Sequence, residues 1–352
     1  MTRVGVIGAS GMAGGELIRI IDQHPHLDAV FLGGSRNVGE TVVALHPNLR
    51  SRNGLVVERV EPGEVRRRCD VVVFATPPAV SARLIPEIAD DTTVVIDMSG
   101  AFRIRSEEVH RQWYPAVRRD QGWAERFSYG VPELISNELA TANLISLPGC
   151  YATAVTLALA PLVFELGLRR STVVIDGKSG SSGGGQRLRR GNLHSYRSGA
   201  ITPYAPGGHR HAAEVEGFLA RRAPDAELTV MMSAYGVGHV RGLLASCYVL
   251  SDKQFDARTL ARTYLRYYRG QHFVRVRDHR ETMVPMPDPH FVVGSNFCDL
   301  TVMPDAAGGR VVALAALDNL IKGAAGQAVQ AMNHRLGHRA EEGLEMQPVA
   351  PV

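Results

Sequence analysis

The glycine spacing near the N-terminus constrains the fold more than any other feature of this sequence. A strand-like apolar segment over residues 3–9 runs into Gly8, Gly11 and Gly14, a G-x-x-G-x-x-G pattern. An apolar-periodic segment that predicts a helix follows over residues 16–22. Gly8 permits a tight turn, and Gly11 lets backbone N–H groups approach a pyrophosphate at the helix start. The pattern predicts the first unit of a dinucleotide-binding domain, although a glycine-rich turn without a ligand has the same spacing.

Further apolar segments extend this unit into an alternating pattern. Residues 29–32, 70–75 and 93–97 have the character of strands, and residues 79–88 that of a helix between the last two. Strands that alternate with helices of this length predict a doubly wound parallel sheet of Rossmann type. The first half of the chain is therefore expected to be an α/β domain.

The loops after these strands hold candidate cofactor contacts. The second strand ends at Gly33-Gly-Ser35-Arg36, where an acid would hydrogen-bond the free 2′-hydroxyl of NAD. Ser35 and Arg36 instead offer a hydroxyl and a guanidinium, which suit a 2′-phosphate, so NADP(H) is the predicted cofactor. An exposed loop arginine is the alternative interpretation. Thr76, Pro77 and Ser99 follow two later strands and are expected to line the same crevice.

Length and composition define the class of protein. A chain of 352 residues is long enough for two domains. Its 45% hydrophobic and 21% charged residues are typical of a soluble globular protein. No apolar stretch approaches the about 20 residues that a membrane span needs. The net charge of +4 comes without zinc-finger spacing or an aromatic-interleaved basic motif, so neither nucleic acid nor a membrane is an expected partner.

The four cysteines indicate a reducing compartment and one candidate nucleophile. They lie scattered at positions 69, 150, 247 and 298, which predicts free thiols and a cytoplasmic protein. Cys150 follows a strand and a Pro148-Gly149 turn, and it opens a helical segment that extends to about residue 165. The dipole and free N–H groups of a helix start favour the thiolate, the nucleophilic form of cysteine. A small buried apolar cysteine is the alternative.

The pattern changes after Cys150. Strand-like segments cover residues 172–176, 227–233, 242–250 and 310–315, with one clear helix over residues 255–268. This alternation predicts an α+β domain with a mixed sheet. A long alanine-rich helix is predicted over residues 317–336, and the tail from residue 339 is expected to be a surface extension. The expected division is an NADP-binding domain over residues 1–149 plus 317–352 and a catalytic and oligomerisation domain over residues 150–316.

Two histidines stand at a predicted helix start in the second half. His209 and His211 follow Gly207-Gly208, and Glu214 lies on the same segment. A histidine near a helix N-terminus favours its neutral form, which suits a proton acceptor and donor. The same residues are potential metal ligands, but no third clustered ligand is evident and no metal is predicted. Two surface histidines are the other interpretation.

Taken together, these segments are similar to the N-acetyl-γ-glutamyl-phosphate reductase family, within the aspartate-semialdehyde dehydrogenase-like group. The matching segments are residues 8–16, 148–154, 208–214, 294–296 and 318–328, in this order along the chain. The resemblance implies an NADP-dependent oxidoreductase that reduces an acyl phosphate to a semialdehyde through a cysteine thioester in amino-acid biosynthesis. A related aldehyde dehydrogenase and a non-enzymatic NADPH-binding regulator are the competing interpretations.

The resemblance also assigns roles to single residues. Cys150 is the nucleophile, His209 the proton shuttle with His211 in reserve, and Glu214 orients one imidazole. The residues expected to bind the cofactor are Gly8, Ser10, Gly11, Met12, Ala13, Ser35, Arg36, Thr76, Pro77, Ser99, Ser179, Gly180 and Asn319. Those expected to bind the substrate are Arg103, Arg210 and Ser182.

The family has two substrate branches. One reduces free N-acetyl-γ-glutamyl phosphate in arginine synthesis; the other reduces a glutamyl or aminoadipyl acyl phosphate tethered to a small acidic amino-group carrier protein, as in lysine synthesis. Residues 46–50, 204–209 and 287–296 are closer to the carrier branch, whereas Tyr151 resembles the free-substrate branch. The apolar strands of the second domain predict a homodimer or homotetramer.

A basic surface for the acidic carrier is expected in the long glycine- and arginine-rich segment of the second half. A solvated arginine-rich loop is the alternative. The residues of this expected surface are Arg187, Arg189, Arg190 and Arg197.

Overall fold

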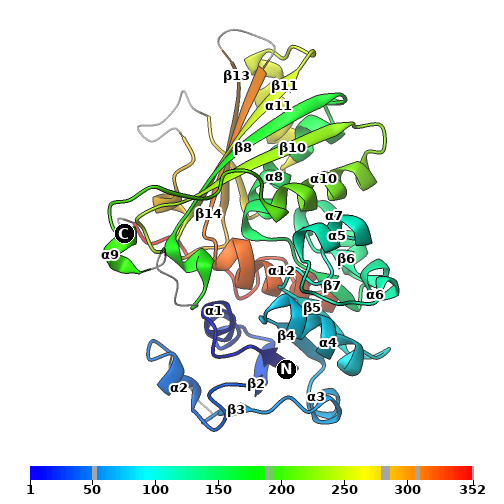
Figure 1. Cartoon of the computed structure of the whole chain (residues 1–352), viewed down its shortest axis with the longest axis vertical. Coiled ribbons are helices and arrows are strands. Elements are labelled where there is room, and N and C mark those ends of the chain that lie inside the picture. The colour runs from blue at the N-terminus through cyan, green and yellow to red at the C-terminus, as the bar shows by residue number, and fades with distance from the viewer. Residues whose placement is uncertain (50–53, 187–190, 192, 279–285, 306–309, 351–352) are drawn as a thin grey trace. The chain divides into compact units, whose positions relative to one another are not determined.

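Two units of the chain each carry one β-sheet (Figure 1). The structure is a computed structural model that describes residues 1–49, 54–186, 191, 193–278, 286–305 and 310–350. Unit 1 comprises Met1–Gly149 and Ala324–Glu345, and unit 2 comprises Cys150–Gly323 and Met346–Val352. The candidate nucleophile is therefore the first residue of unit 2.

Unit 1 contains a fully parallel sheet with the strand order β3-β2-β1-β4-β5-β7-β6. The order extends in both directions from β1, so the winding of the chain reverses between β1 and β4. In such folds a ligand binds outside the carboxyl ends of the strands at the reversal. The predicted doubly wound sheet is confirmed. Its strands are β1 (Thr2–Ile7), β2 (Leu27–Gly33), β3 (Val57–Glu58), β4 (Val71–Phe74), β5 (Val94–Asp97), β6 (Ser128–Tyr129) and β7 (Leu144–Ser146).

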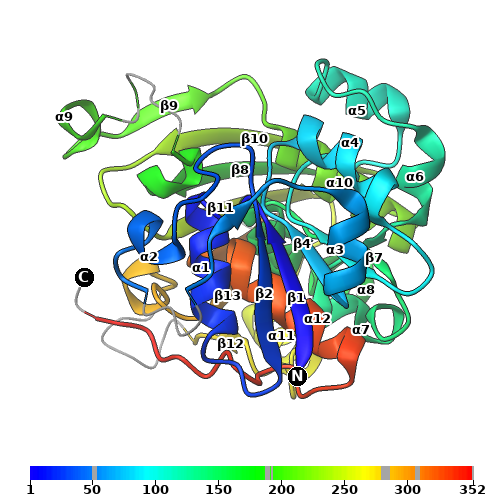
Figure 2. The same ribbon diagram turned by 90° about the horizontal axis from the view of Figure 1, so that it is seen from below.

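Helices cover both faces of this sheet. Ile7 of β1 belongs to a buried cluster with Val65 and Ile85, whereas α1 buries Leu17 and Ile20. Figure 2 shows α1 and α3 on opposite sides of β1 and β2. Because both faces are covered, β4 is apolar throughout, and β1 is buried from Val4 to Ile7. The helices of unit 1 are α1 (Met12–Ile21), α2 (Val42–Leu45), α3 (Pro62–Arg68), α4 (Pro78–Ile88), α5 (Glu107–Trp113), α6 (Gln121–Arg126), α7 (Pro132–Leu139) and α12 (Gly326–Leu336).

Unit 2 contains a mixed sheet with the order β12-β13-β14-β11-β8-β10-β9. The pairs β8–β10 and β12–β13 are parallel, and the other pairs are antiparallel. The predicted mixed sheet is therefore confirmed. The strands are β8 (Ser171–Ser179), β9 (Thr202–Ala205), β10 (Leu228–Gly236), β11 (Leu243–Ser251), β12 (Val274–Val276), β13 (Cys298–Pro304) and β14 (Arg310–Leu317).

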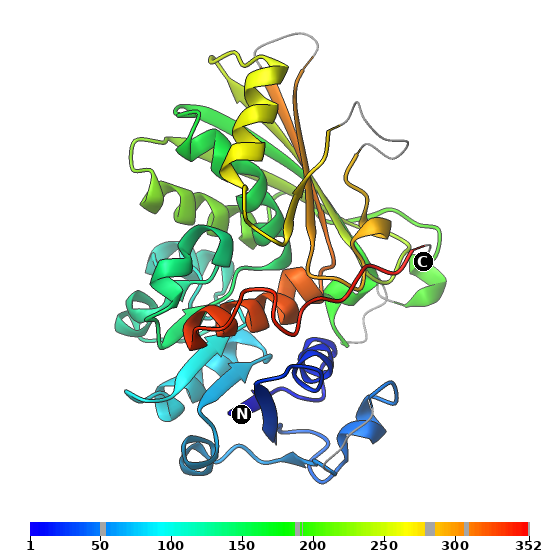
Figure 3. The same cartoon turned by 180° about the vertical axis from the view of Figure 1, so that it is seen from behind.

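The long helices of unit 2 pack on one face of its sheet. They are α8 (Cys150–Phe164), α10 (Arg210–Arg222) and α11 (Ala257–Tyr267), as Figures 1 and 3 show from two sides. A short helix, α9 (His194–Arg197), and 3-10 turns at Ser181–Gly184 and Pro289–Phe291 lie in the connections. No described helix is both long and apolar enough to cross a membrane.

Two predictions for the C-terminal region are wrong. Residues 317–336 do not form one helix, because Leu317 ends β14, Ile321–Ala325 form a π-helical turn, and α12 starts only at Gly326. Asp318 causes the break, since its carboxylate accepts backbone N–H groups of Gly294 and Leu320 at 2.9 and 2.8 Å. The prediction that the tail from residue 339 is a surface extension is wrong at Leu344, which is only 1% exposed, whereas Val349 near the end is 61% exposed.

Candidate active site

Cys150 is the first residue of α8, a helix that is buried on all sides. Every residue from Tyr151 to Val163 is buried, which is the pattern of a central core helix. The backbone passes closely beside this start, because a Cβ at Gly323 would lie 2.6 Å from the Cβ of Cys150. The Cys150 side chain is nevertheless partly exposed, so its thiol is accessible at the start of a helix.

The other three cysteines are poor nucleophiles by comparison. All four lie among the described residues, and Cys69, Cys247 and Cys298 are buried. Burial raises the pKa of the Cys69 thiol to about 11 and that of Cys247 to about 12. Because only the thiolate reacts, these buried thiols are protonated and inert near neutral pH.

Two tyrosines support the helix that carries Cys150. Pro161 lies within α8, and proline has no N–H to donate to the carbonyl four residues earlier. That carbonyl belongs to Leu157, and the Tyr268 hydroxyl donates to it at 2.5 Å. The Tyr264 hydroxyl donates to the carbonyl of Ala158. Both tyrosines come from the α11 region, so α11 satisfies the carbonyl that the proline leaves without a donor and bonds the next carbonyl as well.

His209 caps the start of α10. Its Nδ1 accepts the backbone N–H of His211 at 3.2 Å, so the neutral ring carries its proton on Nε2. Burial, reinforced by the charge of Arg210, lowers the pKa of His209 to about 3. The neutral form expected from the sequence is therefore the form present at physiological pH.

The two candidate imidazoles are in contact with each other. The ring centroids of His209 and His211 lie 4.5 Å apart in an edge-on arrangement, and both side chains are buried. Glu214 is buried on the same helix, three residues after His211. Residues three apart share one face of a helix, so Glu214 and His211 lie on the same side of α10.

Two tyrosines lie near the candidate nucleophile and the imidazoles. The ring of Tyr151 lies 5.7 Å from that of His209 and 6.0 Å from that of His211, and Tyr204 lies 6.0 Å from His209. Burial raises the pKa values of Tyr151 and Tyr204, and the nearby Cys150 sulfur adds to both rises. Tyr151, the residue after Cys150, therefore lies near both imidazoles, and Tyr204 lies near that of His209, all within unit 2. Sequence reasoning did not name Tyr204 as a site residue, because its contact with Tyr151 exists only in the folded chain.

The glycine-rich loop of unit 1 fits a pyrophosphate. Gly8 has a φ of +93°, and a Cβ there would lie 2.5 Å from the carbonyl oxygen of Ala75. A Cβ at Gly14 would lie 2.3 Å from the carbonyl oxygen of Gly8. Helix α1 follows Gly11 without a side-chain cap, so its first N–H groups face an open cradle suited to an anion. The predicted contact Ser10 belongs to this loop, and Met12 and Ala13 are the first two residues of α1.

His46 holds this loop in place, a role that sequence reasoning missed. Its Nε2–H donates to the carbonyl of Ala9 at 2.8 Å, across 37 positions of the chain. Its ring lies on Gly15, where a Cβ would approach the ring to 2.5 Å. A side chain at residue 15 would displace His46, so the glycine is needed for the contact.

The other predicted cofactor residues of unit 1 lie at strand ends. Ser35 and Arg36 are exposed directly after β2. Thr76 follows β4, where its hydroxyl forms a 2.8 Å hydrogen bond with that of Ser81, and Pro77 is the cap position of α4. All four stand at the carboxyl ends of strands, where parallel sheets of this kind bind ligands.

A buried carboxylate fixes the loop that contains Ser99. The backbone N–H and the hydroxyl of Ser99 each donate to the Asp97 carboxylate at 2.9 Å. Burial raises the pKa of Asp97, while these hydrogen bonds and the charge of Arg103 oppose the rise. Arg103, predicted to bind substrate, is 9% exposed and donates to the carbonyl of Met98 at 2.6 Å. Both residues thus shape this loop.

In unit 2, Ser182 and Asn319 make internal hydrogen bonds. The Asn319 amide donates to the Ser182 hydroxyl at 2.9 Å and accepts the N–H of Gly242 at 2.9 Å. The Ser182 hydroxyl donates to the carbonyl of Val240 at 2.7 Å. At Gly180 a Cβ would lie 2.5 Å from the same carbonyl oxygen. These residues hold two loops together, a structural role that sequence reasoning did not predict.

The basic surface predicted for a carrier differs from the expectation at Arg197. Its side chain is buried, and its guanidinium donates to the carbonyls of Val237 and Ser179 at 3.0 Å each. A buried guanidinium satisfied by the chain's own carbonyls presents no charge to a partner, so this part of the prediction is wrong. Arg210, the third predicted substrate residue, is exposed at the start of α10. The remaining predicted docking residues, Arg187, Arg189 and Arg190, lie outside the described residues.

Both units match known protein families. The profile described as semialdehyde dehydrogenase, NAD binding domain matches residues 3–142, and the profile described as semialdehyde dehydrogenase, dimerisation domain matches residues 150–319. A LysW-L-2-aminoadipate/LysW-L-glutamate phosphate reductase of Saccharolobus solfataricus is 37% identical over 99% of this chain and 98% of its own length. An N-acetyl-gamma-glutamyl-phosphate reductase of Nostoc ellipsosporum is 35% identical over 97% and 96% of the two chains. The chain belongs to the N-acetyl-γ-glutamyl-phosphate reductase family.

As a member of this family the protein is an oxidoreductase with a nicotinamide cofactor, which confirms the family resemblance and the enzyme class expected from the sequence. Solved structures are similar in fold. An aspartate semialdehyde dehydrogenase II from Vibrio cholerae, complexed with ASA, has a TM-score of 0.71 at 17% identity and covers 96% of this chain and 98% of its own. An aspartate semialdehyde dehydrogenase with NADP from Candida albicans has a TM-score of 0.70 at 16% identity, with the same coverage.

Proposed function

We propose that this enzyme uses NADPH to reduce an acyl phosphate to a semialdehyde, through a thioester on Cys150. The observation that carries the proposal is the place of Cys150, a partly exposed cysteine at a helix start whose next residue, Tyr151, lies near two buried imidazoles. We further propose that the acyl group is glutamyl or aminoadipyl and is delivered by a small acidic amino-group carrier protein. The full-length likeness to a reductase named for LysW-linked substrates supports this choice.

The first step needs only residues of unit 2. The Cys150 thiolate attacks the carbonyl carbon of the acyl phosphate, and a carbon–sulfur bond forms. The carbon–oxygen bond to the phosphoryl group then breaks, and phosphate leaves with the electron pair. Backbone N–H groups at the start of α8 are suited to stabilise the oxyanion of the tetrahedral intermediate, a contribution of about 10²–10³ in rate.

The cofactor belongs to the glycine-rich cradle of unit 1. Gly8, Gly11 and the first turn of α1 would hold its pyrophosphate, and Arg36 its 2′-phosphate. When bound, the reduced nicotinamide supplies the hydride that converts the thioester to the semialdehyde. Unit 1 is accordingly the proposed NADP-binding domain and unit 2 the proposed catalytic domain.

The helix cap fixes the tautomer of His209, and this gives the two histidines different roles. With Nδ1 engaged by the helix, His209 can donate from Nε2 but cannot accept a proton there. We therefore assign His209 the role of hydrogen-bond donor to the substrate oxygen, keeping its own proton, and His211 that of acceptor for the Cys150 proton. Glu214, on the same side of α10 as His211, is the proposed orienting carboxylate.

A substrate comparison tests the proposed function. Purified enzyme with NADPH is given the carrier-linked acyl phosphate or free N-acetyl-γ-glutamyl phosphate at matched concentrations, and NADPH oxidation is followed by absorbance. We expect a kcat/KM at least about tenfold higher with the carrier-linked substrate. The reverse preference would establish the free-substrate reductase, for which the Nostoc relative is named. In the oxidative direction, turnover that does not need inorganic phosphate would contradict an acyl-phosphate reductase.

The open face of the unit 2 sheet is the proposed dimer surface. Apolar side chains on strands β8, β10 and β11 are exposed in the single chain: Val174 (37%), Met231 (57%), Tyr248 (43%) and Leu250 (41%). Such an exposed apolar patch marks an interface, and the matching profile is described as a dimerisation domain. Met231→Asp should yield monomers in sedimentation velocity, whereas Val240→Asp, at a 66% exposed loop residue, should not.

A further inference from the structure

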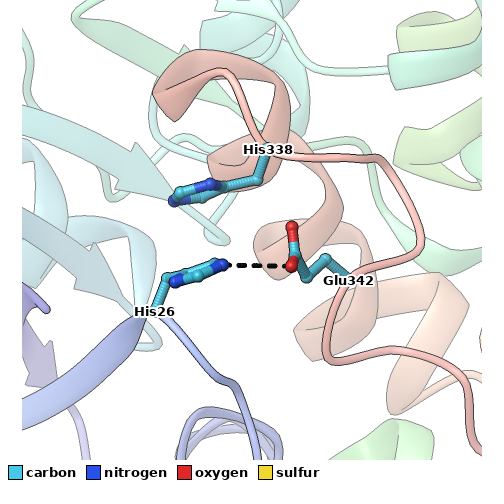
Figure 4. Close-up of side chains that lie close together, drawn as sticks. All are labelled: His26, His338 and Glu342. Carbon is cyan, nitrogen blue, oxygen red and sulfur yellow. Dashed lines mark hydrogen bonds and ion pairs between the residues drawn. The ribbon is translucent and has the colours of Figure 1, made fainter.

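His26, His338 and Glu342 come together in unit 1 from opposite ends of the sequence (Figure 4). His26 precedes β2, and the other two follow α12. His26 Nε2 lies 3.1 Å from a carboxylate oxygen of Glu342. The rings of His26 and His338 are stacked, with centroids 4.6 Å apart and planes at 20°. One potential ligand atom from each residue lies within 4.8 Å of the other two.

We propose that these three residues form a binding site for a divalent transition-metal ion, with Zn²⁺ as the reference ion. Two imidazoles and one carboxylate are a donor set that zinc accepts, with a fourth tetrahedral position left for water. Bonds of about 2.0–2.1 Å separate tetrahedral ligand atoms by about 3.3–3.4 Å. The separation between His26 and Glu342 is already near this value. Rotation of the His338 side chain brings in the third donor.

Buried hydrogen bonds fix the two segments that carry these ligands. His24 accepts the backbone N–H of His26 with Nδ1 at 3.1 Å, and its Nε2 donates to the Asn333 side chain at 3.0 Å. The Asn333 amide donates in turn to the carbonyls of Ala340 and Glu342 at 3.3 and 2.8 Å. His24 thus uses both ring nitrogens and positions the site without serving as a ligand. Such outer partners orient the first shell of metal sites.

The segment around Glu342 packs directly on the ring of His24. Gly343 has a φ of +71°, and a Cβ there would lie 2.1 Å from the ring of His24. The backbone next to Glu342 therefore follows a path that a larger residue could not take. The His26 side chain is 48% exposed and that of Glu342 18%, so an ion reaches the donors from solvent without unfolding of the unit.

A bound ion would cross-link the segment after α12 to the residue before β2. Since the ligands are arranged only in the folded chain, binding stabilises unit 1 in proportion to the ion concentration. The site uses no residue of the proposed active site, and its existence is independent of the proposed reaction. It is also distinct from His209, His211 and Glu214, the potential ligand set considered in the sequence.

Zinc binding by the full chain tests the proposal. The protein should carry no polyhistidine tag, and a Cys150→Ser background removes the one partly exposed thiol. His26→Gln and His338→Gln each remove one imidazole, and glutamine at position 26 can still hydrogen-bond Glu342. The matched control is His290→Gln, because His290 is an exposed imidazole that bonds a single carboxylate, Asp288, at 2.8 Å. Circular dichroism verifies that each variant is folded.

Equilibrium dialysis at micromolar Zn²⁺ should give one ion per chain in the background protein and in His290→Gln. His26→Gln and His338→Gln should each weaken this binding at least about tenfold. Co²⁺ in place of Zn²⁺ should give visible absorption bands of tetrahedral geometry that both of these variants lose. Zinc bound equally by the folded His26→Gln and His338→Gln proteins would overturn the proposal. So would the absence of bound zinc in the background protein, which would leave an ordinary ion pair between His26 and Glu342.

Discussion

The hydrogen bond between Tyr268 and the carbonyl of Leu157 allows a quantitative test of how the catalytic helix is supported. Pro161 removes the N–H that this carbonyl would otherwise accept within α8. Tyr268 is 4% exposed and Leu157 fully buried, so water cannot replace the hydroxyl. Tyr268→Phe should leave the carbonyl without a partner, at a cost of about 1–3 kcal/mol in the free energy of unfolding.

A double-mutant cycle isolates this interaction. Pro161→Ala restores a backbone N–H that can donate to the Leu157 carbonyl. In that background Tyr268→Phe should cost at least about 1 kcal/mol less than in the parent protein. Tyr267→Phe is the matched control at the preceding, half-buried position of α11, with an expected change within about 0.5 kcal/mol.

The assay must report on unit 2. Both tryptophans, Trp113 and Trp123, belong to unit 1, so their fluorescence follows the wrong unit. Hydrogen exchange of the α8 amides, read by mass spectrometry, reports the opening free energy of the helix directly. An equal cost of Tyr268→Phe with and without Pro161 would refute the reasoning, because the tyrosine would then not act through the orphaned carbonyl.

Three further predictions concern single residues. Burial, with the charge of Arg119, lowers the pKa of the fully buried His110 from 6.5 to about 4. The contribution of His110 to the free energy of unfolding is therefore complete above pH 6.5, and it falls by up to about 3 kcal/mol as the pH drops towards 4. Urea midpoints from tryptophan fluorescence should show this loss, and His110→Gln should flatten it; an equally steep profile in the variant would exclude His110 as the cause. His209→Asn should retain the helix cap, with stability within about 0.5 kcal/mol, yet lower kcat by about 10²–10³, and a native kcat would mean that His209 does not contact the reacting oxygen. Arg36→Glu should raise the Kd of NADPH far more than that of NADH, and equal losses would mean that Arg36 does not read the 2′-phosphate.

Local patterns were sufficient to predict most of the architecture. Strands such as β1 and β4 and the helix α4 were found because their periodicity is complete within the element. The strands β3 and β6, of two residues each, carry no periodic signal. The long C-terminal helix was mispredicted because its break depends on Asp318 and its contact with Gly294, which are 24 positions apart. A tertiary contact overrode a favourable local sequence.

The same difference between local patterns and tertiary contacts decides which residues of the candidate site could be predicted. Cys150 and His209 were found because a strand, a turn and a helix start are adjacent in the sequence. His46 was not, since its contact with Ala9 exists only in the folded chain. Arg197 was misjudged for a related reason, because sequence cannot distinguish an exposed arginine from one that donates to buried carbonyls.

The central claim, a thioester on Cys150, is tested most directly by omitting the reductant. Enzyme and the acyl phosphate are mixed without NADPH, phosphate release is measured, and the digested protein is analysed by mass spectrometry. We predict one equivalent of phosphate and one acyl group on the Cys150 peptide, no adduct on Cys69, Cys247 or Cys298, and neither product in Cys150→Ser. An acyl adduct on another residue, or full turnover by Cys150→Ser with NADPH, would contradict the account.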